Sequence, residues 1–343
     1  MQKLVYIFFT FSIFTILSCQ TVVEDIKLPY EERMVIQSFI SPQDTLLEVK
    51  VSKTKPVTGT FPINQFYGNK GFESLEGATI EISDGNKKGV FQLQTLVNPL
   101  NFENDPNTGK LVPQSRRGYF LRTKDFPIVA GRTYTLTAKA PNLPDVLASC
   151  TVPKLQMLNE KDFFVLKGKT IDSVQNGYSS TNGVITNRYY NLSRRFDVKI
   201  KDFINEENYY AVAYYTRNDY QYDDGRGNRL TQINVSQQPY SEFINDYKND
   251  GALLNFKKAN IPIGSYSTYP NLLNPKELSN VLLIYVAVTD KPYYQYNKAL
   301  GNSQGINNND PFSEAVLTYS NINGGLGIFA GYNMTEVQFD LLK

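Results

Sequence analysis

The chain has 343 residues, with 35 Lys and Arg against 33 Asp and Glu, so its formal net charge is only +2. This balance gives no sign of a nucleic-acid-binding surface. His is absent, which excludes imidazole-dependent catalytic triads and removes the commonest zinc ligand. Paired carboxylates do not stand out either, so we expect a non-enzymatic protein without a cofactor or a metal centre.

The N-terminus has the pattern of a bacterial signal peptide. A short basic segment precedes an apolar run at residues 4–17, which is shorter than the about 20 residues that a bilayer-spanning helix needs. Ser18 and Cys19 follow this run and resemble a lipobox, in which a small residue precedes the lipid-modified cysteine. We expect residues 1–18 to be the signal peptide, Cys19 to carry the lipid anchor and residues 19–29 to form a tether. An ordinary signal peptide with an incidental Cys19 is the alternative.

Cys150 is the second of the 2 cysteines, so no disulfide can form within the chain if Cys19 is acylated. A secreted chain without disulfides depends on its hydrophobic core, and this chain is long enough for a sizeable one. We expect Cys150 to be a small buried apolar side chain in a strand.

Residues 30–153 have the alternating pattern of an antiparallel β domain. Apolar and polar side chains alternate at 47–52, 80–83 and 134–139, and Gly, Pro, Asn and Asp separate the segments. About seven such strands predict a β-sandwich of immunoglobulin-like architecture, although the Cys and Trp landmarks of that superfamily are missing.

Residues 160–343 are predicted to form a second mainly β domain with a few short helices. The segment 209–216 has no polar face, so we expect a central strand buried on both sides. Helices are expected at 241–248 and 292–300.

Four connections are longer than a compact domain needs, and long loops are usually functional or mobile. They are residues 54–77, 98–118, 170–193 and 236–275. The first is rich in aromatic residues, and we expect Phe61, Phe66, Tyr67 and Phe72 to contact a partner or a ligand. Packing of these rings back over the sandwich is the alternative.

Asp219, Asp223 and Asp224 lie beside Gly225 and suggest calcium, because hard cations bind clustered carboxylates on tight loops. The spacing does not fit an EF-hand, since Leu230 occupies the position of the bidentate acid. We interpret the segment as the polar tip of a β-hairpin, and metal binding near the three acids is left open.

The glycine-rich segment 324–327 is not followed by the Lys-Ser or Lys-Thr of a phosphate-binding loop, and a strand-like segment comes next. We expect these glycines to allow a tight turn or close backbone packing.

Six segments together resemble one known family. The most specific is Tyr319-Ser320-Asn321-Ile322-Asn323-Gly324-Gly325-Leu326-Gly327-Ile328-Phe329. The others are residues 34–42, 52–57, 77–85, 130–136 and 208–210. In this order and spacing they resemble lipoproteins of Bacteroidetes-type bacteria that are grouped only as a domain of unknown function and are often encoded beside TonB-dependent outer-membrane receptors.

The resemblance implies an envelope lipoprotein at the outer membrane that works with a β-barrel receptor, and it implies no catalytic residues. We therefore expect a lipid-anchored binding or accessory protein that captures a ligand, such as a small molecule or a glycan, for the receptor or docks onto it. A structural or assembly factor of the outer membrane is the alternative, and an envelope hydrolase is a weaker one. The side of the membrane on which the protein lies is left open.

Overall fold

The structure is a computed structural model, and it describes residues 30–54, 74–104, 111–154, 160–162, 166–223, 229–247, 250–256, 261–268, 276–304 and 319–340. This part of the chain is mainly β and includes one α-helix, which confirms the predicted fold class at that level. Its helices include none of the length and apolarity required to cross a membrane. The elements below all belong to one of the two units into which the chain divides, residues 33–53 and 72–343.

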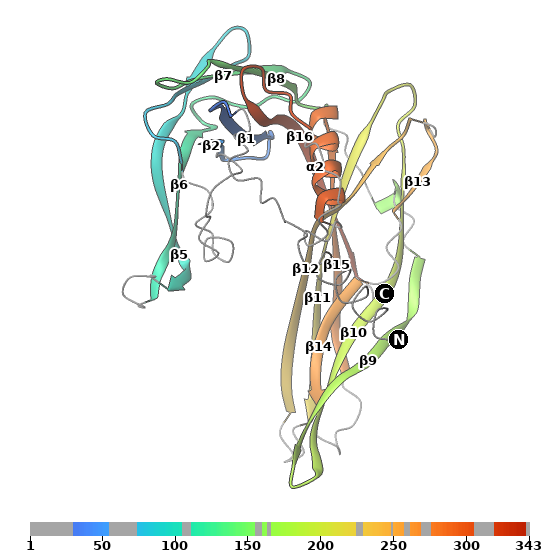
Figure 1. Cartoon of the computed structure of the whole chain (residues 1–343). Coiled ribbons are helices and arrows are strands. Elements are labelled where there is room, and N and C mark those ends of the chain that lie inside the picture. The colour runs from blue at the N-terminus through green and yellow to red at the C-terminus, as the bar shows by residue number, and fades with distance from the viewer. Residues whose placement is uncertain are drawn as a thin grey trace, which may run out of the picture. The chain divides into compact units, whose positions relative to one another are not determined.

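The largest element is an eight-stranded sheet. Its strands are β1 (Met34–Ile40), β2 (Leu46–Lys53), β5 (Gln92–Asn104), β6 (Leu111–Arg122), β11 (Tyr209–Asp223), β12 (Arg229–Asn245), β15 (Lys276–Thr289) and β16 (Leu326–Asp340). They lie in the order β12-β11-β15-β16-β1-β2-β6-β5 (Figure 1). β1 and β16 pair in parallel, whereas the other neighbours in this sheet pair antiparallel. The first and last described strands therefore lie side by side in the interior of the sheet.

A four-stranded sheet covers one face of this assembly near β1 and β2. It consists of β3 (Thr79–Ser83), β4 (Lys88–Val90), β7 (Thr133–Lys139) and β8 (Val146–Thr151), in the order β4-β3-β7-β8. The alternation seen in the sequence gives each strand one buried face, and Ile82 and Leu136 join Ile36 and Val49 in one hydrophobic core. Cys150 is a buried free thiol in this core, as predicted. Both sheets are open, and the immunoglobulin-like arrangement stays a prediction.

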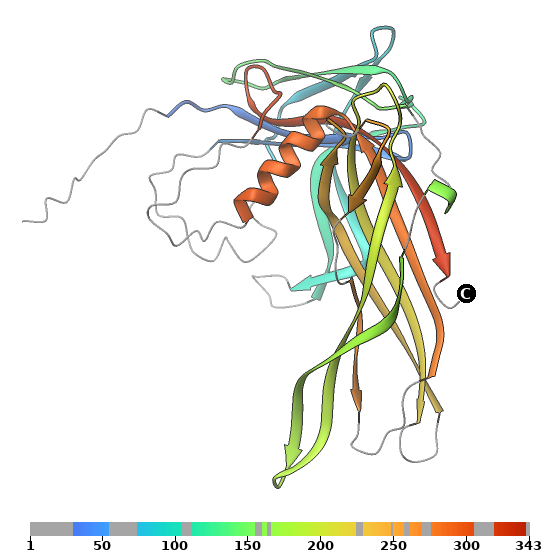
Figure 2. The same ribbon diagram turned by 90° about the vertical axis from the view of Figure 1, so that its right-hand side faces the viewer.

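A third sheet contains β9 (Leu166–Thr181), β10 (Val184–Lys201), β13 (Leu253–Phe256) and β14 (Ile261–Thr268), with β10 paired to the other three. β9 and β10 form a long hairpin, seen in green in Figure 2. It turns at Asn182 and Gly183, whose positive φ angles of 53° and 79° are those of a two-residue hairpin turn. The prediction of a loop at 170–193 was therefore wrong, because polar side chains in this segment lie on a long hairpin.

β11 is buried on both faces, as the sequence predicted, and it is an interior strand that lies second from the edge of the sheet and not at its centre. Tyr210 and Val212 are fully buried on one face, in a core with Leu282 and Ile284 of β15, and Ala211 is fully buried on the other. Strands β12 and β15 flank β11 on its two edges.

One predicted helix is confirmed and the other is wrong. Helix α2 (Lys291–Gln304) covers the segment predicted at 292–300 and continues beyond it. Residues 241–245 instead end β12, because Phe243 and Ile244 pack into cores on opposite sides of the sheet. Such alternation satisfies a strand and would leave a helix without a single apolar face.

Two further predicted loops also contain strands. Residues 98–118 include most of the β5–β6 hairpin, and residues 236–275 include the end of β12 together with β13 and β14. A short 3-10 helix, η3 (Glu160–Asp162), follows the predicted domain boundary. The large sheet contains strands from both predicted domains, 30–153 and 160–343, and the division between those domains stays a prediction.

Candidate functional site

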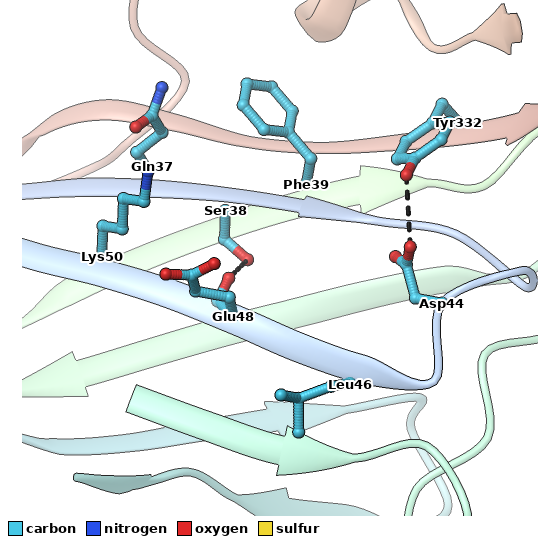
Figure 3. A pocket seen from close by; sticks show the side chains of 8 residues that line it. All are labelled: Gln37, Ser38, Phe39, Asp44, Leu46, Glu48, Lys50 and Tyr332. Carbon is cyan, nitrogen blue, oxygen red and sulfur yellow. Dashed lines mark hydrogen bonds between the residues drawn. The ribbon is translucent and has the colours of Figure 1, made fainter. Parts of the chain in front are cut away.

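A pocket of about 260 Å³ opens on the face of the large sheet that lies opposite the Ile36 core. β1, β2 and β16 and the β1–β2 turn supply the eight side chains around it (Figure 3). They are Gln37, Ser38, Phe39, Asp44, Leu46, Glu48, Lys50 and Tyr332.

Strand alternation explains why most of these residues meet; Ser38 lies on the buried face of β1 and donates to the Glu48 carbonyl at 2.9 Å. Even-numbered residues of β1 such as Ile36 point into the core, so Gln37 and Phe39 project from the other face. In β2 the core residues are odd-numbered, which leaves Glu48 and Lys50 on the pocket side. Gln37 lies opposite Lys50 in the register.

The turn between β1 and β2 is fastened to β16 beside the pocket. The Gln43 side-chain amide donates to Asn333 Oδ1 at 2.7 Å, and the Tyr332 hydroxyl donates to Asp44 Oδ1 at 3.2 Å (Figure 3). Asp44 Oδ2 accepts a further bond of 2.8 Å from the backbone N–H of Ser41. Burial raises the pKa of Asp44 above its usual value, and these two bonds oppose that change. The contacts hold Asp44 and Tyr332 in fixed positions at one end of the pocket.

Aromatic rings form one wall. The ring of Phe39 lies 5.1 Å from that of Tyr293 and 6.2 Å from that of Tyr296, both on α2. The ring centroids of Tyr293 and Tyr332 are also only 5.7 Å apart. Helix α2 is held there because the Asp290 carboxylate caps its first turn, accepting from the backbone N–H of Tyr293 at 2.9 Å.

The opposite side of the pocket is charged. Glu48 forms an ion pair of 3.0 Å with Arg116, whose guanidinium lies 5.6 Å above the Phe120 ring. Lys50 is exposed. The lining thus combines aromatic rings with an amide, two carboxylates and an ammonium group, which can stack on a polar ligand and hydrogen-bond to it.

A comparison with known protein families matches residues 21–338 to DUF4249, a domain of unknown function. The chain belongs to this family. No curated protein matches the chain. The DUF4249 match agrees with the sequence resemblance to a family of unknown function. It covers all eight residues of the pocket, which is therefore part of the DUF4249 domain itself.

The residues predicted from the sequence to form the anchor and the contact loop lie outside the described part of the DUF4249 chain. These are Cys19, Phe61, Phe66, Tyr67 and Phe72. Their roles stay predictions.

The interpretation of the segment with Asp219 and Asp223 as part of a β-hairpin agrees with the structure. β11 ends at Asp223 and β12 begins at Arg229, and the two strands pair antiparallel up to these residues. Asp219 forms an ion pair of 3.1 Å with Arg217, which lowers the pKa of the Asp219 carboxyl. Asp224 lies outside the described residues.

A different acidic cluster was missed by the sequence analysis. Asp202, Asp246 and Asp250 bring carboxylate oxygens within 4.8 Å of one another. Asp202 lies more than forty residues from the other two in the sequence, so no local spacing of acidic residues predicts the cluster. The pocket was missed for a similar reason, since its geometry depends on the pairing of β1 with β16.

Proposed function

We propose that this DUF4249 protein is a lipid-anchored, non-enzymatic binding protein of the bacterial outer membrane, which captures a polar ligand for a TonB-dependent receptor. The observation that carries the proposal is the pocket, where aromatic rings and hydrogen-bonding side chains converge on one sheet face. An immunoglobulin-like sandwich around the Ile36 core serves as its scaffold.

A glycan is the ligand class that fits this lining best. Half-buried rings such as Phe39 and Tyr332 can pack against the C–H face of a sugar, while Gln37, Asp44 and Lys50 can bind its hydroxyl groups. The pocket volume of about 260 Å³ lies just below the range of about 300 to 1,000 Å³ that is usual for small-molecule sites. The pocket therefore suits one ring of a longer chain.

Binding to immobilised bacterial and plant oligosaccharides, followed by calorimetry, tests the ligand part of the proposal. Changing Gln37 and Lys50 together to Ala should lower the affinity at least about tenfold, because two hydrogen-bonding groups are lost. Lys87 and Gln92 are exposed, and the same change at these positions is the matched control. Absence of glycan binding by the wild type, or equal binding by both double variants, would overturn the pocket assignment.

The anchor is tested separately. A fatty-acid probe fed to the producing bacteria should label the wild type and fail to label Cys19→Ser, since the thioether forms on sulfur. Two or three acyl chains would hold the protein stably at the membrane. Labelling that persists in Cys19→Ser would rule the anchor out.

Purification of the lipidated protein from outer membranes tests the receptor. A β-barrel receptor should accompany the wild type. Recovery of membrane-assembly proteins in its place, without glycan binding, would favour a structural or assembly factor.

A further inference from the structure

Two loops meet at one end of strands β10 to β13 and bring three carboxylates together. Residues 202–208 connect β10 to β11, and residues 246–252 connect β12 to β13. Asp202 and Asp246 are only 3% and 2% exposed, whereas Asp250 is exposed. The cluster is thus buried on one side and open to solvent on the other.

Backbone donors hold each carboxylate in place. Gly251 N–H donates to Asp202 Oδ2 at 2.9 Å, and Asn205 N–H donates to Asp250 Oδ1 at 2.9 Å, so each of these bonds crosses from one loop to the other. The Tyr210 hydroxyl donates to Asp202 Oδ1 at 2.6 Å. Carboxylates fixed in this way cannot simply turn apart to relieve their mutual repulsion.

The negative charge of the cluster is not balanced by the described side chains. No Lys or Arg among the residues that the structure covers forms an ion pair with Asp202, Asp246 or Asp250. Burial raises the pKa of Asp246, and the nearby charges of Asp202 and Asp250 raise it further. A buried group of like charges is costly unless a counter-charge neutralises it.

A neighbouring amide points independently to ligand binding at the cluster. Asn208 is 7% exposed, and its Oδ1 atom is buried without a hydrogen-bond partner in the described structure. Its backbone N–H donates to Asp246 Oδ2 at 2.8 Å, and its carbonyl accepts from Asp246 N–H at 3.3 Å. Asn208 and Asp246 thus lie opposite each other where the β11–β12 ladder ends.

Strand alternation directs this amide toward the cluster. Tyr209 faces α2, where its ring lies 5.0 Å from that of Tyr294. Tyr210 points to the other face and reaches Asp202, and Asn208 projects to the same face as Tyr210 because it is two residues away. The Asn208 oxygen is therefore an unsatisfied acceptor on the side of the three carboxylates.

We infer that Asp202, Asp246, Asp250 and Asn208 form a calcium-binding site. Calcium takes six to eight oxygen ligands in flexible geometry, and these residues supply carboxylate and amide oxygens from fixed backbone positions. Water can complete the shell on the exposed side at Asp250. Magnesium is less suitable, because it needs near-ideal octahedral geometry and dehydrates reluctantly.

Thermal unfolding of the mature chain, residues 19–343, tests the inference. Extracellular calcium modules have Kd values of about 0.1 to 1 mM, so 5 mM calcium chloride should raise Tm by about 2 to 8 °C relative to EDTA. Terbium should also bind and give emission sensitised by Tyr210, and calcium should displace it.

Asp250→Asn is the decisive variant, because this exposed residue can keep its bond from Asn205 while it loses its charge. The calcium-induced rise in Tm should fall to less than half of the wild-type value. Asp145 is exposed and pairs with Lys139 at 2.8 Å, so Asp145→Asn is the matched control and should respond like the wild type.

Three results would overturn the inference. Absence of a calcium response in the wild type would show that the three carboxylates do not bind calcium. An equal response in Asp250→Asn would place any bound ion elsewhere, and an equal rise of Tm with magnesium would exclude the assignment to calcium.

Discussion

Asp290 Oδ2 accepts a hydrogen bond of 3.0 Å from the backbone N–H of Gly331. Oδ1 of the same carboxylate caps helix α2 through Tyr293, and the backbone N–H of Thr151 in β8 also donates to the Asp290 carboxyl group. One partly buried side chain thus joins a helix and strands from two sheets. Burial raises the pKa of Asp290 to about 7, although these backbone hydrogen bonds act in the opposite direction.

The first prediction concerns the pH dependence of stability. Between pH 4 and 7 the folded protein holds a proton on Asp290 that the unfolded chain has released, since the ordinary pKa is 3.8. The free energy of unfolding should therefore fall as the pH rises through this window. Urea unfolding of Asp290→Asn should show a slope that is smaller by up to about 1.4 kcal/mol per pH unit.

The control for this prediction is Asp145→Asn, which removes an exposed carboxyl and should leave the slope unchanged. Asp44 and Asp246 also have raised pKa values, so part of the slope should remain in Asp290→Asn. Equal slopes for the wild type and Asp290→Asn would contradict the prediction.

The second prediction concerns Gly327, where β16 begins to pair with β1. Its φ is +111°, and a Cβ atom there would lie 1.9 Å from the carbonyl oxygen of Ile36. Gly327→Ala should destabilise the fold by about 3 kcal/mol, because both the backbone angle and the clash oppose a side chain. Gly85 is the control that separates the backbone angle from the clash, because its φ is +90° but a Cβ atom there would meet no atom within 4 Å. Gly85→Ala should therefore cost about 1 kcal/mol. If chemical denaturation gives a similar loss of unfolding free energy for Gly327→Ala and Gly85→Ala, the clash at Gly327 is relieved and the prediction is wrong.

The third prediction concerns the interior strand β11. Val212 is fully buried, and Val212→Asp should destabilise the protein by at least about 4 kcal/mol, since an unpaired charge would enter the core. Val235 on the neighbouring strand β12 is 54% exposed, so Val235→Asp should change stability by less than about 0.5 kcal/mol. Thermal unfolding followed by circular dichroism distinguishes the two, and a Tm for Val212→Asp near that of Val235→Asp would refute the prediction.

The fourth prediction concerns the aromatic segment 54–77. Replacement of Phe61, Phe66, Tyr67 and Phe72 by Ser should weaken association with the proposed outer-membrane receptor, each lost ring costing about 1 to 2 kcal/mol, while the sheets stay folded. Recovery of the partner by affinity purification and the Tm of the variant are measured together. A large loss of Tm would assign the rings to a core, and unchanged recovery with an intact fold would show that this segment does not contact the partner.

Local patterns in the sequence predicted local structure well. Alternation in β2, β3 and β7 identified the core faces, and the glycines at 324–327 do allow close packing, since a Cβ at Gly324 would lie 2.1 Å from the Asp145 carbonyl oxygen. The failures were segments where tertiary contacts outweigh local preference. Residues 241–245 begin with Ser and Glu, a helix-start signal, yet they form a strand because β11 offers them backbone partners and cores on both faces.

The candidate sites were less predictable than the strands. Phe39 and Glu48 could be assigned to a face of their strands, but nothing local indicates that Tyr332 completes the same pocket almost three hundred residues later. The same holds for Asp202 and Asp246, whose proximity depends on the pairing of β10 with β13 and of β11 with β12. Sequence patterns report the face of a strand, whereas a site depends on which strands are neighbours.

The parallel pairing of β1 with β16 has a consequence for biogenesis. Ile36 lies opposite Gly327, so the interior of the large sheet cannot close until the last part of the chain has been synthesised and released. Contacts of such long sequence separation are slow to form and leave strand edges exposed in the meantime. A chain that ended before Leu326 would leave one edge of β1 unpaired, and chaperones and proteases would act on it as an unfinished substrate.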